Sequence, residues 1–336
     1  MTQNLGKSKH DIIGVGNALV DVRLSLKNSD IASLGLKPGE TKLINEEVFS
    51  RLCGMAGDSP MVSGGACANS AVVASSLGIS CAYIGQAGDD EAGTVFLSSL
   101  VERGVHMLRE PLPKSPENPK TGRCFMIQAP DGQIAKAIYL GASSRLFWVD
   151  INTAAMLDAR FLLAEGYLFE YQSNQKYLTE LLKFAKGCRL TVACTLPDKA
   201  VIERYRRVIL KALEFIDILI GNESEIQCLF PANGIIRSFT EGLAFSPRTL
   251  FIATLGHKGA AAAIRQDIVM VKPEKISAVV DKDGAGDAFA AGFLYGRIKG
   301  LTLKQSLKIG NICANEIICH EGHLPKTPLL PLIQSV

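Results

Sequence analysis

Short apolar runs alternate with longer segments of helical spacing from Phe161 onward. The apolar runs predict strands near residues 160–167, 189–195, 216–221 and 249–255. The longer segments predict helices near residues 174–187, 199–213, 222–230 and 303–320. Because strands that alternate with helices pair side by side in parallel, this pattern predicts a mainly parallel sheet with helices on both faces.

The first part of the chain adds two strands to this sheet. Apolar runs at residues 11–17 and 81–85 predict buried strands. Between them, Gly64-Gly65 precedes a predicted helix that runs to about Leu77, where Gly78 provides its C-cap. The pair Gly14-x-Gly16 does not continue into a dinucleotide fingerprint, because Leu19 occupies the place of the third glycine. We therefore do not expect binding of NAD.

A second, smaller sheet is predicted beside the first. Residues 121–128 and 133–140 predict a hairpin around the turn Asp131-Gly132, and residues 20–44 contain short alternating runs. These segments predict a lid contributed by about 18–49 and 112–141, inserted into an α/β core. No linker of low complexity divides the chain, so we expect a single domain over residues 1–336.

The stretch Asp281-Lys282-Asp283-Gly284-Ala285-Gly286-Asp287 carries the most informative chemistry. Gly284 to Gly286 predict a turn that opens a helix near Ala285, since apolar residues of helical spacing follow. The first backbone N–H groups of a helix lack internal partners and favour an anion such as a phosphoryl group. Asp287 lies in the first turn, where a carboxylate can serve as a general base. The spacing alone leaves open a glycine loop with Asp283 or Asp287 as a helix cap.

Polar side chains gather at two further places. Asn17 and Asp21 follow the first predicted strand, at the sheet edge where α/β folds bind ligands. Gly64, Gly65 and Asn69 begin the helix described above. A plain glycine turn with one polar helix residue remains the alternative for this second group.

Composition excludes several other classes of protein. The chain has 336 residues, of which 47% are hydrophobic and 21% charged, which is typical of a globular protein with a sizeable core. The net charge of +3 is scattered, which argues against a nucleic-acid partner. No apolar run approaches the ~20 residues that cross a bilayer. The polar N-terminus and nine cysteines without a Cys-x-x-Cys pair lead us to expect a cytoplasmic enzyme with free thiols.

The cluster Cys319-His320-Glu321-Gly322-His323 contains residue types that bind metals. It lies at the end of the last predicted helix, just before Pro325, and has no second ligand pair nearby, so we do not expect a metal site there.

Residues 281–287 resemble the signature Asp-Thr-x-Gly-Ala-Gly-Asp of the PfkB (ribokinase-like) carbohydrate and nucleoside kinases. The resemblance implies a ribokinase-like three-layer α/β/α fold with a mainly parallel central sheet and a small β-sheet lid, which excludes water from the reaction. It also implies that Gly284, Ala285 and Gly286 form an anion hole and that Asp287 is the catalytic base. Lys282 departs from the signature, because the family usually has Thr at that place.

Further motifs extend the resemblance over nearly the whole chain. Gly64, Gly65 and Asn69 are similar to the family residues that bind sugar hydroxyls. Asn222 and Glu225 match the family's Asn-x-x-Glu, which organises magnesium and phosphate through water, although Asn222 can also be a helix cap. The remaining matches, which the resemblance places at the ATP site, are Thr254, Gly256, Gly259 and Asn311.

The resemblance implies an ATP-dependent kinase that uses Mg²⁺ and phosphorylates a primary hydroxyl of a nucleoside or sugar. Glu165-Gly166-Tyr167 and the segment at Asn17 resemble the adenosine-kinase-like branch, in which Asn17, Asp21 and Asn69 hold ribose hydroxyls. Related sequences have an arginine near the place of Ile134, and Lys136 can substitute for it. A ribokinase- or fructokinase-type sugar kinase and a non-catalytic sugar-binding relative remain alternatives. Activation by K⁺ and the choice between monomer and homodimer stay open.

Overall fold

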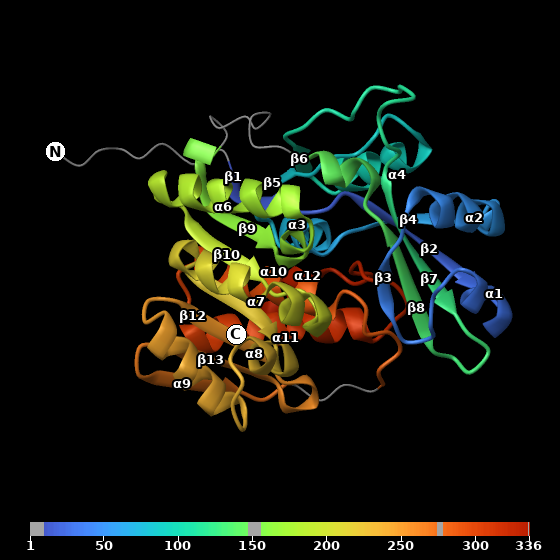
Figure 1. Ribbon diagram of the computed structural model, residues 1–336. Helices are drawn as coiled ribbons and strands as arrows, with labels where there is room; N and C mark the ends of the chain where they lie inside the picture. The colour runs from blue at the N-terminus through green and yellow to red at the C-terminus, as the bar shows by residue number, and fades with distance from the viewer. Residues whose placement is uncertain (1–9, 147–155, 274–277, 335) are drawn as a thin grey trace.

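The computed structural model describes residues 10–146, 156–273, 278–334 and 336. Their strands form two sheets, a larger one of order β14-β13-β12-β11-β10-β9-β1-β5-β6 and a smaller one of order β3-β8-β7-β2-β4. The smaller sheet stands beside the main body, as Figure 1 shows.

The larger sheet is parallel from β6 to β12, and β13 and β14 complete it in antiparallel pairing. Its parallel strands are β1 (His10–Val15), β5 (Cys81–Ile84), β6 (Val105–Met107), β9 (Ala159–Glu165), β10 (Thr191–Thr195), β11 (Ile218–Asn222) and β12 (Leu250–Thr254). The last two strands are β13 (Ala260–Ile264) and β14 (Asp267–Val271). In the pairing register, Thr195 lies opposite Glu165 and Asn222 opposite Thr254, so the parallel strands end at one common edge.

Helices cover both faces of the larger sheet because its strands are apolar on both sides. One face packs against α3 (Ala66–Ser76), α4 (Glu91–Glu102), α10 (Ala285–Ile298), α11 (Leu303–Ile318) and α12 (Leu329–Ile333). The other face packs against α6 (Gln172–Gly187), α7 (Lys199–Ala212), α8 (Glu223–Leu229) and α9 (Ile235–Phe245). Close approach of α10 to α11 requires Gly292, because a β-carbon there would lie 2.7 Å from Cys313 Sγ.

The smaller sheet has its own hydrophobic core. Its strands are β2 (Leu19–Ser25), β3 (Thr41–Leu43), β4 (Met61–Gly64), β7 (Gly122–Gln128) and β8 (Ile134–Tyr139). Helices α1 (Asn28–Ser33) and α2 (Glu46–Ala56) cover one face, where Phe49 stacks on Tyr139 with ring centroids 4.0 Å apart. Along β2, Val22 and Leu24 point into this core, whereas Asp21 and Arg23 alternate with them and face the other way.

The structure confirms the predicted three-layer arrangement with a mainly parallel sheet and a smaller second sheet. The smaller sheet also includes β4, which lies outside the segments predicted for the lid. Strand β13 begins with four alanines, which favour helices in isolation, but burial inside the sheet overrides this preference. None of the helices in the described ranges is long and apolar enough to cross a membrane.

Candidate active site

A cavity of about 320 Å³ is lined by residues of both sheets and of α10. Its polar side chains include Asn17, Asp21, Asn69, Lys136, Glu165, Asp283 and Asp287, together with Thr41, Tyr167, Glu170, Asp198 and His323. The smaller sheet and the segment after β8 contribute apolar side chains to the wall, namely Leu19, Leu43, Met126, Ile138 and Leu140. The cavity therefore brings together residues that are more than 250 positions apart in the sequence.

Gly284 fixes the turn that opens α10. It is the N-cap residue in a left-handed conformation (φ 78°), and a β-carbon there would lie 2.5 Å from Cβ of His323. The Ala285 N–H donates to Lys282 O at 3.3 Å, while the N–H groups of Gly286 and Asp287 meet no backbone acceptor among the described residues. These two amides and the helix dipole favour an anion at the start of α10.

Asp287 lies in the first turn of α10 and borders the cavity. Its Oδ2 accepts a hydrogen bond from Asn69 Nδ2 at 3.0 Å, and its backbone carbonyl accepts one from Ser70 Oγ at 3.0 Å. Burial raises the pKa of Asp287 to about 7, although the hydrogen bond from Asn69 works against that rise. A carboxylate that titrates near neutral pH is suited to accept a proton from a substrate hydroxyl.

The capping alternative for this stretch is wrong. The N-cap of α10 is Gly284, which has no side-chain hydrogen bond, and neither neighbouring acid caps the helix. Asp283 instead pairs with Lys136, whose Nζ lies 2.8 Å from Asp283 Oδ1. Lys282 is exposed to solvent.

Asn17 and Glu165 form a buried pair at the ends of β1 and β9. The backbone N–H and Nδ2 of Asn17 donate to the Glu165 carboxylate at 3.3 and 2.9 Å, and the Cys67 N–H donates at 3.2 Å. Burial nevertheless raises the pKa of Glu165 to about 7. Asn17 Oδ1 is buried and has no hydrogen-bond partner among the described residues, so it can accept one from a ligand in the cavity.

The two glycines before α3 allow the chain to approach these polar groups. A β-carbon at Gly64 would lie 2.5 Å from Asp21 Oδ1, and one at Gly65 would lie 2.4 Å from Asn17 O. Gly65 also has a positive φ of 92°, which other residues adopt only with strain. The predicted glycine pair thus borders both Asn17 and Asp21.

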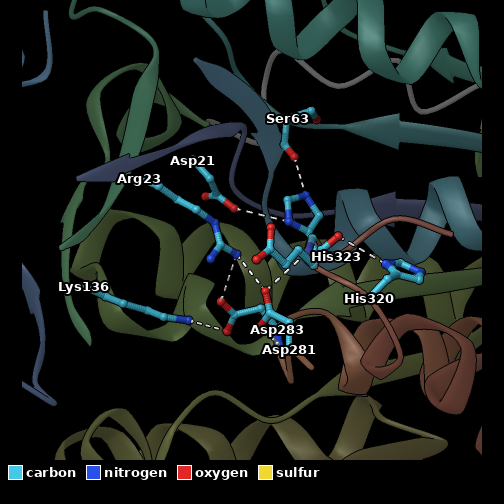
Figure 2. A network of polar contacts seen from close by, with 10 residues as sticks. Asp21, Arg23, Ser63, Lys136, Asp281, Asp283, His320 and His323 are labelled. Atoms are coloured by element: carbon cyan, nitrogen blue, oxygen red, sulfur yellow. Dashed lines mark hydrogen bonds and ion pairs between the residues drawn. The ribbon is translucent and has the colours of Figure 1, made fainter. Parts of the chain in front are cut away.

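Two ion pairs connect the smaller sheet to the loop before α10. Arg23 Nη2 lies 2.8 Å from Asp281 Oδ2, and Lys136 pairs with Asp283 as described above. Figure 2 shows both cations reaching from the smaller sheet toward this loop. Lys136 also lines the cavity.

The predicted ATP-associated residues lie outside the lining of this cavity. Asn222 and Glu225 form a reciprocal capping box at the start of α8, so the capping interpretation of Asn222 is confirmed. Burial raises the pKa of Glu225 to about 7. Thr254 ends the neighbouring strand β12 and lies opposite Asn222.

The turn after β12 and one side chain of α11 complete this group. Gly256 and Gly259 have positive φ values of 58° and 97°, and a β-carbon at Gly259 would lie 2.0 Å from Val271 O. Asn311 is buried in α11, and its Nδ2 has no hydrogen-bond partner among the described residues.

Within the described ranges, no cluster of three His, Cys, Asp or Glu side chains is arranged to hold a metal. Of the two histidines in the cluster at residues 319–323, His320 pairs with Glu316 and His323 is buried beside Asp21. Sequence reasoning did not single out His323 or Glu165 as site residues. For Glu165, the available signal was an acid at the carboxyl end of a buried strand.

Comparison with known proteins shows the family. The profile of the pfkB family of carbohydrate kinases matches residues 33–328. An uncharacterized sugar kinase of Archaeoglobus fulgidus is 27% identical over 252 residues, which are 73% of this chain and 93% of that protein. The crystal structure of adenosine kinase from Sinorhizobium meliloti has a TM-score of 0.88 at 29% identity and covers 97% of this chain and 99% of its own. A probable sugar kinase of Rhizobium etli also has a TM-score of 0.88, at 27% identity, with 98% of each chain covered.

The matches extend over almost all of the fold described above, including both sheets and α10. The chain therefore belongs to the pfkB family of carbohydrate kinases and is an ATP-dependent kinase of sugars or nucleosides.

Proposed function

We propose that this kinase phosphorylates the primary hydroxyl of adenosine. The observation that supports this choice is that the cavity has apolar as well as polar lining. Leu19, Met126 and Ile138 of the smaller sheet form an apolar wall, and Asn17, Asn69 and Asp287 add polar groups from outside that sheet. A nucleoside offers both kinds of surface, because its base has flat apolar faces whereas its ribose carries hydroxyls. A free sugar would leave the apolar wall without a partner.

The polar side chains can bind ribose through complementary hydrogen bonds. Asn17 Oδ1 is an acceptor without a partner in the described chain, and Asp21 also lines the cavity. Hydroxyl groups can donate to both, so we assign ribose binding to Asn17, Asp21 and Asn69, with Gly64 and Gly65 shaping the backbone around them. This assignment directs the primary hydroxyl toward Asp287.

Asp287 is the proposed general base. Its carboxylate takes the proton of the attacking hydroxyl as that oxygen bonds to the transferred phosphoryl group. The turn Gly284–Gly286 stabilises the negative charge through the free N–H groups at the start of α10. Asn69 and Ser70 hold Asp287 in place from α3, and correct positioning supplies much of the rate enhancement in phosphoryl transfer.

The chain also fits ATP and Mg²⁺. Asn311 presents an unpartnered buried donor, which suits an adenine ring, and Thr254, Gly256 and Gly259 form a turn at the neighbouring strand end. Magnesium binds phosphate oxygens and water with one or two carboxylates, so Glu225 acting through water is sufficient without a protein cage. When bound, magnesium neutralises charge on the phosphates. Activation by K⁺ remains a prediction, which a potassium titration of the rate tests.

We further propose that residues 1–336 work as one kinase unit, with the lid drawn from about 18–49 and 112–141 and extended by β4. Closure of the lid over the acceptor would exclude water, which otherwise competes for the phosphoryl group. The pairing of Arg23 and Lys136 with the loop before α10 supports a link between the lid and the base.

A panel of acceptors tests the proposal. Wild-type protein is assayed for ADP release with ATP, Mg²⁺ and adenosine, ribose or fructose. Adenosine is expected to give the highest kcat/KM. Faster turnover of ribose or fructose would support the sugar-kinase alternative, which the sugar kinases among the relatives favour. Tight binding without turnover of any acceptor would indicate a non-catalytic relative.

Asp287→Asn is the matched control in this assay. Loss of the general base is expected to lower kcat at least ~10²-fold and to leave acceptor binding largely intact. Near-normal turnover by Asp287→Asn would remove Asp287 from the proposed role.

A further inference from the structure

His323 is a buried side chain that the proposed reaction does not use. It lies on the segment after α11 with 6% of its surface exposed, and it contacts both β4 and β2 of the smaller sheet. Its Nε2 is 2.6 Å from Ser63 O, and its Nδ1 is 3.7 Å from Asp21 Oδ2. Figure 2 shows the imidazole ring between these two partners.

The partners of His323 determine where its protons lie. A backbone carbonyl can only accept a hydrogen bond, so Nε2 must carry a proton in the contact with Ser63 O. Nδ1 then faces a carboxylate oxygen at the distance of an ion pair rather than a hydrogen bond. A proton on Nδ1 makes this contact attractive to a carboxylate at Asp21, whereas two lone pairs facing each other would repel.

The other charged groups around Asp21 already have partners. Lys136 and Arg23 also face Asp21, but they pair with Asp283 and Asp281 respectively. Asp283 and Asp287 add negative charge nearby. Burial raises the pKa of Asp21, and His323 is the strongest of the groups that oppose this rise.

We propose that His323 is a positioning residue for the acceptor, which keeps Asp21 as a carboxylate aimed into the cavity. The inference rests on the proposed role of Asp21 in binding acceptor hydroxyls. An ionised carboxylate accepts hydrogen bonds from two neighbouring hydroxyls more strongly than a neutral carboxyl group does. His323 also lines the cavity, and on this proposal its effect on the acceptor is exerted through Asp21.

Two substitutions of His323 test the contacts of its two ring nitrogens separately. His323→Gln can place an amide donor near the position of Nε2 and keep the contact with Ser63 O, but it offers nothing at Nδ1. His323→Asn can place a neutral donor near Nδ1 and loses the contact with Ser63. Both keep the main chain and Cβ, which pack against Gly284. His320→Gln is the matched control, because His320 lies on the same segment and pairs with Glu316 outside the cavity.

The experiment measures KM and kcat for whichever acceptor the wild-type protein phosphorylates fastest, together with KM for ATP. His323→Gln is expected to raise the acceptor KM roughly tenfold, as for loss of a hydrogen bond or ion pair to a charged group. Its kcat and its KM for ATP should stay within about twofold of wild type. His323→Asn should raise the acceptor KM less than His323→Gln, and His320→Gln should match wild type.

The double variant Asp21→Asn/His323→Gln decides whether His323 acts through Asp21. The double variant is expected to have the acceptor KM of Asp21→Asn alone, because the two residues act as one unit. An unchanged KM in His323→Gln, or effects of the two single substitutions that multiply, would overturn the proposal. An unchanged KM in Asp21→Asn would overturn it as well and would also remove Asp21 from acceptor binding. This test can use any acceptor that the wild-type protein phosphorylates. Its outcome is therefore independent of the acceptor panel, which tests whether adenosine is the preferred substrate.

Discussion

Asn69 Nδ2 lies 3.0 Å from Asp287 Oδ2, so α3 and α10 meet at the proposed general base. The sequence suggested different tasks for the two residues, hydroxyl binding for Asn69 and proton abstraction for Asp287. Their contact shows that Asn69 also orients the carboxylate of Asp287 and favours its ionised form, against the larger effect of burial. In the part of the chain that the structure describes, no donor occupies Asp287 Oδ1, which leaves that oxygen for the acceptor.

This contact predicts the pH dependence of the reaction. The pKa of Asp287 is raised to about 7, and only the ionised form can accept a proton, so kcat/KM should fall as pH drops below about 7. The hydrogen bond from Asn69 stabilises the ionised form, so Asn69→Ala should move this acid limb to higher pH. Profiles of kcat/KM against pH for both proteins make the measurement.

Asn233→Ala, in an exposed loop, serves as the control and should keep the wild-type profile. Burial also raises the pKa of Glu165 to about 7, so a limb near neutral pH alone does not identify the base. If the acid limb of the pH profile reports the ionisation of Asp287, it should shift when Asn69 is removed, because Asn69 is hydrogen-bonded to Asp287. An acid limb near pH 4 in wild type, or no shift in Asn69→Ala, would contradict the assignment.

Gly284 allows a prediction about stability. Gly284→Ala puts a β-carbon at φ 78° and 2.5 Å from His323 Cβ, so the free energy of unfolding should fall by about 1–3 kcal/mol. Displacement of the turn should also lower kcat by roughly 10²-fold. Unfolding in urea and steady-state kinetics provide the two measurements.

Gly286→Ala is the matched control for Gly284→Ala. A β-carbon at Gly286 has no atom within 4 Å and Gly286 does not have a positive φ, so its stability should equal or exceed that of wild type. Equal stability of the two variants would show that the turn tolerates a side chain at 284 and is less constrained than the contacts indicate.

Asn311→Leu is expected to stabilise the protein, in contrast to Gly284→Ala, and it also tests the proposed ATP site. Its buried Nδ2 has no partner in the described chain, so Asn311→Leu should raise the free energy of unfolding by about 1 kcal/mol. If this donor binds the nucleotide, the same substitution should raise KM for ATP up to about tenfold and leave the acceptor KM unchanged. A loss of stability with unchanged KM for ATP would assign Asn311 to packing.

Local signals made much of the site predictable from sequence. Gly284, Gly286 and Asp287 lie within one turn, so the sequence itself places the glycines and the acid at the start of a helix. The strand ends at Asn17 and Asn222 were predictable because periodicity locates strands, and parallel strands share an edge.

Contacts between distant segments were not predictable in the same way. Glu165 is hydrogen-bonded to Asn17, which is 148 positions away, and His323 to Ser63, which is 260 positions away. The pattern of apolar and polar residues along the sequence does not reveal either contact. The short strand β4 and the alanine-rich β13 were missed for a related reason, since pairing with neighbouring strands rather than local preference determines both.

The apolar wall and the proposed general base lie on different parts of the fold. Leu19, Met126 and Ile138 come from the smaller sheet, whereas Asp287 stands on a helix packed against the larger one. If the wall contacts the acceptor as proposed, substitutions in it are expected to change the choice of acceptor and to leave proton abstraction by Asp287 in place. Because these two parts of the site are separate, proteins of this fold would be able to differ in substrate and still share one reaction.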